Sequence, residues 1–126
     1  MNKLIRSMPF NRVVCIRLTH IHRDGITIEC KLRPQLLNGS GVLHGGVTAT
    51  LADAAVGIAI VQRKGLGSAT TVEMKLNYLR PVSSGKVTAR ARLLRMGSRL
   101  CIGRVDIFDD ARSLVSSALV TYMLLK

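Results

Sequence analysis

The chain has 126 residues, of which 48% are hydrophobic; this fits one domain, residues 1–126, with a sizeable core, and excludes a disordered chain. The formal net charge of +12 favours a polyanionic partner or ligand. Aromatic residues make up only 3%, and no helix-turn-helix or zinc-finger pattern occurs, so we do not expect nucleic-acid binding. The positive charge could instead bind a small phosphorylated ligand, or the basic side chains could simply be solvated at the surface.

The beginning of the chain predicts a hairpin rather than a targeting segment. The first 23 residues carry five cations and no acid, a composition that resembles a transit peptide. However, residues 13–22 also have the composition of a strand that the fold would need, so we expect no cleavage there. Asp24-Gly25 predicts a two-residue turn, and residues 26–33 alternate apolar and polar side chains as a half-buried strand does.

A long helix is expected next, from about Gly45 to Gln62, after a loop rich in Asn, Gly and Ser. The helix is apolar nearly all round, which predicts that other elements enclose it. Its apolar run, residues 47–61, is too short to span a bilayer and contains Asp53, so no membrane segment is expected.

Four more strands are predicted by alternating apolar and polar side chains: residues 68–79, 86–94, 100–108 and 114–125. Turn signals rich in Gly, Ser, Pro or Asp separate them. The order ββαββββ predicts an α+β fold, in which one antiparallel sheet of five or six strands curls around the central helix.

The cysteines indicate the compartment. Cys15, Cys30 and Cys101 are odd in number, set among apolar residues and outside any metal-ligand spacing. We expect buried, reduced thiols and no metal site, which indicates a cytoplasmic protein.

The loop NGSGVLHGG, the helix LADAAVGIA and the strand ending NYLRP resemble the hotdog-fold acyl-CoA thioesterases. The most similar branch is that of phenylacetic-acid-pathway and small human-type thioesterases. The resemblance runs from about Pro9 to Tyr122, and HGG followed seven residues later by Asp is its most specific part. It implies hydrolysis of acyl-CoA without a cofactor, by a homodimer that commonly forms a homotetramer as a dimer of dimers.

The resemblance also implies roles for individual residues. The histidine of the HGG motif falls on His44, the oxyanion-binding glycine on Gly45, the loop asparagine on Asn38 and the catalytic carboxylate on Asp53. Some members use a Ser or Thr on the strand after the helix, which falls on Thr71.

The residues themselves support such a site. The first amides of a helix lack intrahelical acceptors, the helix dipole is positive there, and glycines let a ligand approach, so Gly45 and Gly46 suit a developing oxyanion. Asp53 has no cation near it in the helix and is a candidate base or nucleophile, while Gly57 leaves space beside it.

Two polar residues of the loop have both a catalytic and a structural interpretation. His44 would orient the carbonyl or the glycine loop, or would simply pack at the helix start. Asn38 would orient the lytic water, or would simply form a turn.

Spacing along the helix predicts the assembly. Asp53 lies eight residues beyond Gly45, or about 12 Å along the axis. One carbonyl group has to lie about 3 Å from both groups. Two antiparallel helices related by a two-fold axis satisfy this, so we expect Gly45 of one subunit to face Asp53 of its partner.

Arginines near predicted turns are candidates to hold the phosphates of coenzyme A: Arg80, Arg95 and Arg99. The alternative function is a non-catalytic acyl-CoA-binding protein, a sensor or carrier of the same fold. A hydratase would need a histidine in the helix, and this helix has none. The sequence leaves the acyl group, aryl or fatty, undecided.

Overall fold

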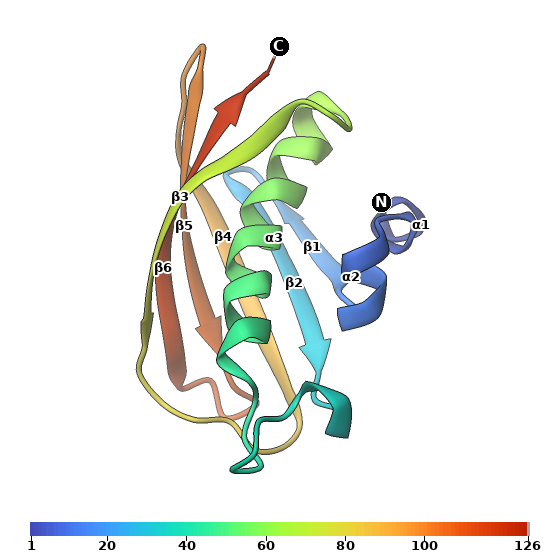
Figure 1. Cartoon of the computed structure of the whole chain (residues 1–126). Helices are drawn as coiled ribbons and strands as arrows, with labels where there is room; N and C mark the ends of the chain where they lie inside the picture. Colours follow the sequence, from blue (N-terminus) through green and yellow to red (C-terminus); the bar gives the residue numbers. More distant parts are fainter. Residues whose placement is uncertain (126) are drawn as a thin grey trace.

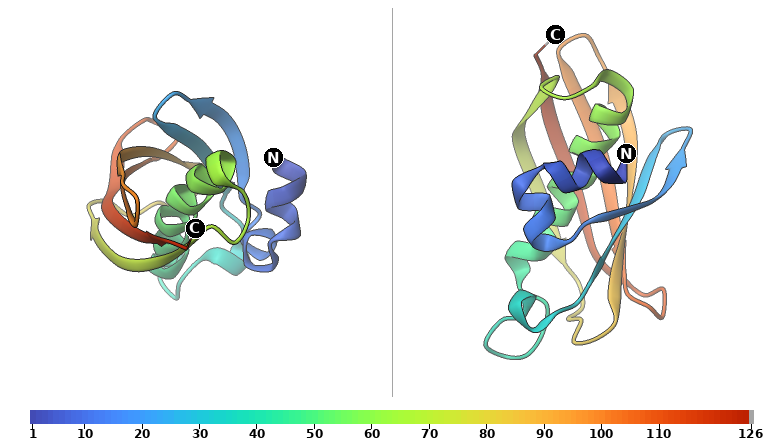
Figure 2. Two further views of the ribbon diagram at one scale, coloured as in Figure 1. Left: turned by 90° about the horizontal axis from the view of Figure 1, so that it is seen from above. Right: turned by 90° about the vertical axis from the view of Figure 1, so that its right-hand side faces the viewer.

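The computed structural model describes residues 1–125 and has the predicted architecture. Its six strands form one antiparallel sheet in the order β1-β2-β4-β5-β6-β3, which curls around the long helix α3 (Figures 1 and 2). The elements are α1 (Asn2–Ser7), α2 (Pro9–Val14), β1 (Arg17–His22), β2 (Gly25–Lys31), the 3-10 turn η1 (Pro34–Leu36), α3 (Gly45–Lys64), β3 (Ala69–Tyr78), β4 (Lys86–Met96), β5 (Leu100–Phe108) and β6 (Leu114–Leu124). The prediction of a hotdog fold with a sheet wrapped around one helix is confirmed.

Small residues on the concave face of the sheet let α3 approach closely. On β5, a Cβ added to Gly103 would lie 2.7 Å from Cγ2 of the fully buried Val56 in α3. Ala89 and Ala91 of β4 are also buried on this face. The helix therefore lies near enough to the strands for their side chains to reach its backbone.

The composition of the helix predicted that other elements enclose it on every side, and this prediction is wrong for one face. A stripe of mostly small residues along α3 is only half buried: Ala49, Thr50, Asp53, Ala54 and Gly57. At 20 residues, α3 also has the length and composition of a membrane span, unlike the shorter run considered in the sequence. In this fold, however, its other faces pack into the core, and burial of apolar surface accounts for the composition.

The strand predicted for residues 13–22 is wrong in its first part. Helix α2 continues to Val14, Cys15 ends it with a left-handed φ of 61°, and β1 begins only at Arg17. Pro9 at the first turn of α2 has the backbone angle that a helix start needs. The two short helices that this produces pack beside the sheet (Figure 2).

An asparagine ties the first helix to the edge of the sheet. The side-chain amide of Asn2 donates to the Leu18 carbonyl at 3.0 Å, and its oxygen accepts from the Leu18 amide at 2.8 Å. Ile5, fully buried, anchors the same helix in the core. Part of the outer edge of β1 is therefore occupied by the chain itself, which protects it from pairing with another strand.

The hairpin turn lies one residue earlier than predicted. His22 pairs with Gly25, so Arg23 and Asp24 form the two-residue loop and Gly25 belongs to β2. A Cβ on Gly25 would lie 1.9 Å from the Ala91 carbonyl oxygen, so glycine is required for β2 to approach β4.

The cysteine prediction holds for two of the three thiols. Cys30 and Cys101 are buried, whereas Cys15 is exposed because it lies at the end of α2 rather than in a strand. Burial raises the pKa of the Cys30 thiol to about 11, so this thiol stays protonated and unreactive at neutral pH.

Replacing Gly103 with alanine should destabilise the fold. The added methyl group overlaps Val56 and forces the helix or the strand to move, which costs about 1–3 kcal/mol of unfolding free energy. Chemical denaturation of Gly103→Ala measures this. Gly39→Ala is the matched control, because an added Cβ at Gly39 meets nothing within 4 Å and should leave the midpoint almost unchanged. Equal midpoints for the two variants would contradict the close-packing argument.

Candidate active site

The first turn of α3 is capped by a histidine. The Gly46 amide donates to Nδ1 of His44 at 2.8 Å, and the amides of Val47 and Thr48 donate to the His44 carbonyl. The Gly45 amide donates to no acceptor within residues 1–125. Of the two glycine amides suggested by the sequence, Gly45 therefore remains available to a ligand, and Gly46 does not in this arrangement.

This capping bond also fixes the tautomer of His44. Because Nδ1 accepts a hydrogen bond, the proton of the neutral ring is on Nε2. The side chain is exposed, so its Nε2–H can donate to a group outside the chain. One histidine thus holds the glycine turn and presents a donor beside the Gly45 amide.

Gly45 lines a pocket of about 330 Å³ between the start of α3 and the end of β3. The hydroxyl of Tyr78 donates to the Gly45 carbonyl at 2.6 Å and fixes the turn from the strand side. Asn38 lines the same pocket, but its side-chain oxygen accepts from the amides of Ser40 and Val42. Asn38 therefore forms the turn, as one of its two interpretations predicted, and it also lines the pocket.

Asp53 lies halfway along α3, where two hydroxyl groups hold one of its carboxylate oxygens. Thr71 of β3 donates to Oδ1 at 2.7 Å, and Tyr122 of β6 lies 2.9 Å from the same oxygen. The other oxygen, Oδ2, has no hydrogen-bond partner within residues 1–125. Asp53 is half buried rather than sealed in the core, as an acid that meets a substrate must be.

A bulge in β3 places Thr71 toward the helix. Thr71 pairs with Tyr122, but the next pair is Glu73 with Thr121, so Val72 is the extra residue. Directly paired residues point to the same face of a sheet, and both hydroxyls therefore reach α3.

The carboxylate borders a second pocket, of about 320 Å³. Most of the side chains that line it are apolar, and they come from the N-terminal segment, from α3 and from the following loop: Met8, Phe10, Ala54, Ile58, Val61 and Leu66. Gly57 lies in this wall beside Asp53, as the sequence suggested. The site therefore combines a fixed carboxylate with a compartment suited to an apolar group.

The structure does not bring all of the predicted residues together. Within one chain, Gly45 and Asp53 line different pockets. Arg80, two residues after β3, lines the pocket at Gly45, whereas Arg95 and Arg99 belong to the β4–β5 hairpin. The end of β3 and the β4–β5 hairpin lie at opposite ends of the sheet (Figure 1). The three arginines thus do not form one phosphate site in a single chain.

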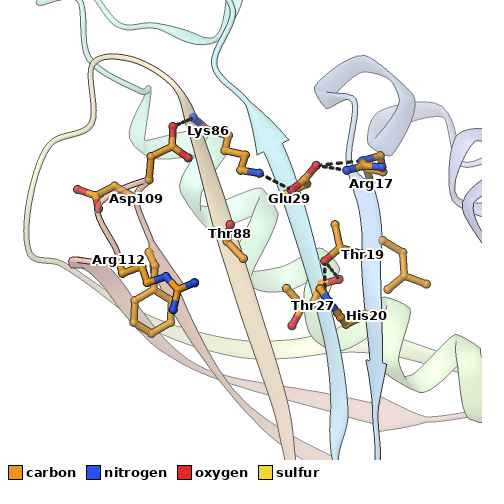
Figure 3. A pocket seen from close by; sticks show the side chains of 12 residues that line it. Arg17, Thr19, His20, Thr27, Glu29, Lys86, Thr88, Asp109 and Arg112 are labelled. Carbon is orange, nitrogen blue, oxygen red and sulfur yellow. Dashed lines mark hydrogen bonds and ion pairs between the residues drawn. The ribbon is translucent and has the colours of Figure 1, made fainter.

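Another hollow, of about 810 Å³, lies on the face of the sheet turned away from α3 (Figure 3). Three acids line it: Glu29, Asp109 and Asp110. Glu29, which lies between β1 and β4, forms ion pairs with Arg17 and with Lys86, the latter at 3.1 Å. Partial burial opposes ionisation of Glu29, but the two cations outweigh it and lower the pKa of the carboxyl group. A carboxylate neutralised in this way is a poor general base, and none of the residues singled out in the sequence lines this hollow.

Sequence reasoning missed the two tyrosines of the site. Tyr78 and Tyr122 donate hydrogen bonds to residues of α3 from strands that come later in the sequence. The alternation of side chains in a strand predicts which face of the sheet a residue lies on, but not which helix residue it contacts. As for a metal, no group of three or more His, Cys, Asp or Glu within residues 1–125 is placed to hold an ion.

Comparison with known proteins agrees with the geometry. The sequence profile of the thioesterase superfamily matches residues 40–116, more than half of the chain. The medium/long-chain acyl-CoA thioesterase YigI of Escherichia coli K12 is 29% identical over 92% of this chain and 85% of its own. The crystal structure of thioesterase HI1161 of Haemophilus influenzae superposes with a TM-score of 0.91, at 28% identity, over 99% of this chain and 87% of its own.

A third similar protein is the phenylacetic acid degradation protein PaaI of Thermus thermophilus, whose structure is that of a point mutant. Its TM-score is 0.83 at 27% identity, over 93% of this chain and 99% of its own. The chain therefore belongs to the thioesterase superfamily, as its HGG motif and spaced aspartate suggested, and is a thioester hydrolase.

Proposed function

We propose that the protein hydrolyses acyl-CoA to a free acid and coenzyme A in a site built from two copies of the chain. The observation that carries the proposal is the arrangement on α3: an unengaged amide at Gly45 and a carboxylate at Asp53 with one free oxygen. Each group borders its own pocket, and a second, antiparallel helix would bring the two groups together.

The amide end suits the thioester carbonyl. When an oxygen nucleophile adds to the carbonyl carbon, the C=O electron pair moves to the oxygen, and the Gly45 N–H donates to the resulting oxyanion. The helix dipole adds positive potential at the same point. His44, with its proton on Nε2, is a second donor or an orienting group for the carbonyl.

Asp53 either activates the water that attacks the thioester carbonyl or attacks it directly. As a base, Asp53 takes a proton from water while the water oxygen adds to the carbonyl carbon. Collapse of the oxyanion breaks the C–S bond, and the proton passes to the departing thiolate. As a nucleophile, the free oxygen would instead form an anhydride that water then cleaves. Both routes give the same products.

The partner subunit would dock on the open side of the protomer. Strand β3 is at the edge of the sheet, and its second long edge has no strand beside it among residues 1–125. Large apolar side chains are exposed there, Val72 at 53% and Leu79, just after the strand, at 52%. An exposed edge of this kind is adapted for pairing with a second copy. Association of two dimers into a tetramer stays a prediction from the family resemblance.

The pocket beside Asp53 suits an aliphatic acyl chain. Its walls are mainly apolar, and YigI is named a medium/long-chain acyl-CoA thioesterase, which favours fatty over aryl substrates. For the coenzyme A phosphates, Arg80 is the candidate at the Gly45 pocket, and Arg95 and Arg99 are candidates from the distal hairpin. A cytoplasmic location fits the three free cysteines.

Asp53→Asn tests the catalytic assignment. The amide keeps the size of the side chain but cannot accept a proton from water, so we expect kcat to fall about 100- to 10,000-fold. Release of free thiol from a panel of acyl-CoA substrates measures this, and circular dichroism checks the fold. A wild-type protein that binds acyl-CoA without releasing thiol would instead support the non-catalytic sensor or carrier.

Mixing two inactive variants tests the composite site. Gly45→Pro removes the amide proton at a helix position where proline is well tolerated, and should lower kcat about 100- to 1,000-fold. In a mixed dimer with Asp53→Asn, one site carries both substitutions and the other carries neither. Random mixing of subunits should therefore recover about a quarter of wild-type turnover. Mixed subunits that stay as inactive as the single variants would show that each site lies within one chain.

A further inference from the structure

We propose that Tyr122 is a positioning residue for Asp53, and that Gly57 is the gap in α3 through which its hydroxyl reaches the carboxylate. The inference rests on the proposed function, because it assigns a role in the chemistry of the same site. Tyr122 lies on β6, which is far from the HGG motif and from α3 in the sequence.

The tyrosine hydroxyl contacts Asp53 at two atoms. It lies 2.9 Å from Oδ1 of the carboxylate and 2.8 Å from the backbone carbonyl oxygen of the same residue. The side chain is almost fully buried, with 7% of its surface exposed, so packing determines where the hydroxyl lies. Thr71, its cross-strand partner, donates to the same Oδ1 at 2.7 Å.

Gly57 provides the space for this contact. It follows Asp53 by one helical turn, and a Cβ added there would lie 2.7 Å from the tyrosine oxygen and 3.3 Å from the ring carbon that carries it. A larger residue would therefore push the hydroxyl away from the carboxylate. Glycine in a helix interior costs about 1 kcal/mol relative to alanine, and access of the Tyr122 hydroxyl explains why it is present.

Holding one oxygen determines the direction of the other. Rotation about the terminal torsion of an aspartate is soft and would exchange the two oxygens. With Oδ1 fixed by two hydroxyls, Oδ2 is the oxygen left without a partner within residues 1–125. A fixed direction for the attacking or proton-accepting oxygen lowers the entropic part of the barrier.

The tyrosine remains a donor throughout the pH range of an assay. Burial raises the pKa of Tyr122, and the negative charge of Asp53 adds to this rise. Among the residues that line the pocket, contributed by the N-terminal segment, α3, the α3–β3 loop, β3 and β6, Asp53 and Tyr122 are the only titratable ones. No lysine or arginine lines it, so the hydroxyls are the polar support that the chain gives the carboxylate there.

Tyr122→Phe removes the hydroxyl and keeps the ring. We expect kcat to fall about tenfold with KM almost unchanged, because a hydrogen bond to a charged group is lost while the pocket keeps its shape. Ser117→Ala is the matched control: it removes another β6 hydroxyl that donates to a carboxylate, that of Asp106 at 2.8 Å, and should change neither kcat nor KM.

Gly57→Ala tests the gap. The added methyl group overlaps the buried tyrosine, which offsets the roughly 1 kcal/mol that alanine gains as the better helix former, so the melting temperature should stay near that of the wild type while kcat falls as in Tyr122→Phe. In the double variant the displaced hydroxyl is already absent, so its kcat should resemble that of Tyr122→Phe alone rather than the product of the two losses. Multiplicative losses would overturn the role given to Gly57.

A purely structural tyrosine predicts a different result. In that case Tyr122→Phe would lower the melting temperature or leave everything unchanged, with kcat as in the wild type; either result overturns the proposal. To separate this from failure of the proposed function, the NMR signal of the Asp53 carboxyl carbon is compared at one neutral pH in the wild type, Tyr122→Phe and Ser117→Ala. A signal displaced in Tyr122→Phe alone supports the contact even if the wild type hydrolyses no acyl-CoA; an undisplaced signal refutes it in either case.

Discussion

The short distance between α3 and the concave face of the sheet is the constraint on which the rest of this structure depends. Gly103 on β5 has no side chain, so Val56 of α3 packs against the backbone of the strand. At this separation, hydroxyls from β3 and β6 reach Asp53 on the helix. A wider gap would leave the carboxylate supported by water and free to rotate. The polar contacts of Asp53 therefore depend on the close packing of the helix against the sheet.

The two ends of the chemistry receive different kinds of support. In the proposed mechanism, the reactive group at the start of α3 belongs to the backbone, and the side chains of His44 and Tyr78 hold it in place. The proposed reactive group at the middle of α3 is the side chain of Asp53, and other side chains hold it. One continuous helix carries both, and this is the reason that the proposed mechanism calls on a second copy of the chain to bring them within reach of one substrate.

Much of the fold could be predicted from the sequence, because alternation in the strands and the single apolar helix leave few arrangements of layers. The N-terminal helices could not, since six-residue segments carry too little periodicity, and residues 13–16 are as apolar as a strand. The HGG motif and the spacing that follows it were enough to make Asp53 and Gly45 candidates. The contacts of Thr71 and Tyr122 were not, because they depend on a bulge at Val72 and on pairing between strands distant in the sequence.

The pair of hydrogen bonds between the Asn2 side chain and the Leu18 backbone has a consequence for substrate range. Met8 and Phe10 form part of the wall of the apolar pocket, and they lie between two anchored points, Ile5 in the core and the start of β1. Met8 and Phe10 are separate from the helix and sheet that hold Asp53 and Gly45. In the proposed acyl-CoA hydrolysis, variation in the first dozen residues can therefore change which acyl groups fit while these two groups stay in place, so selectivity and chemistry are free to evolve independently in this scaffold.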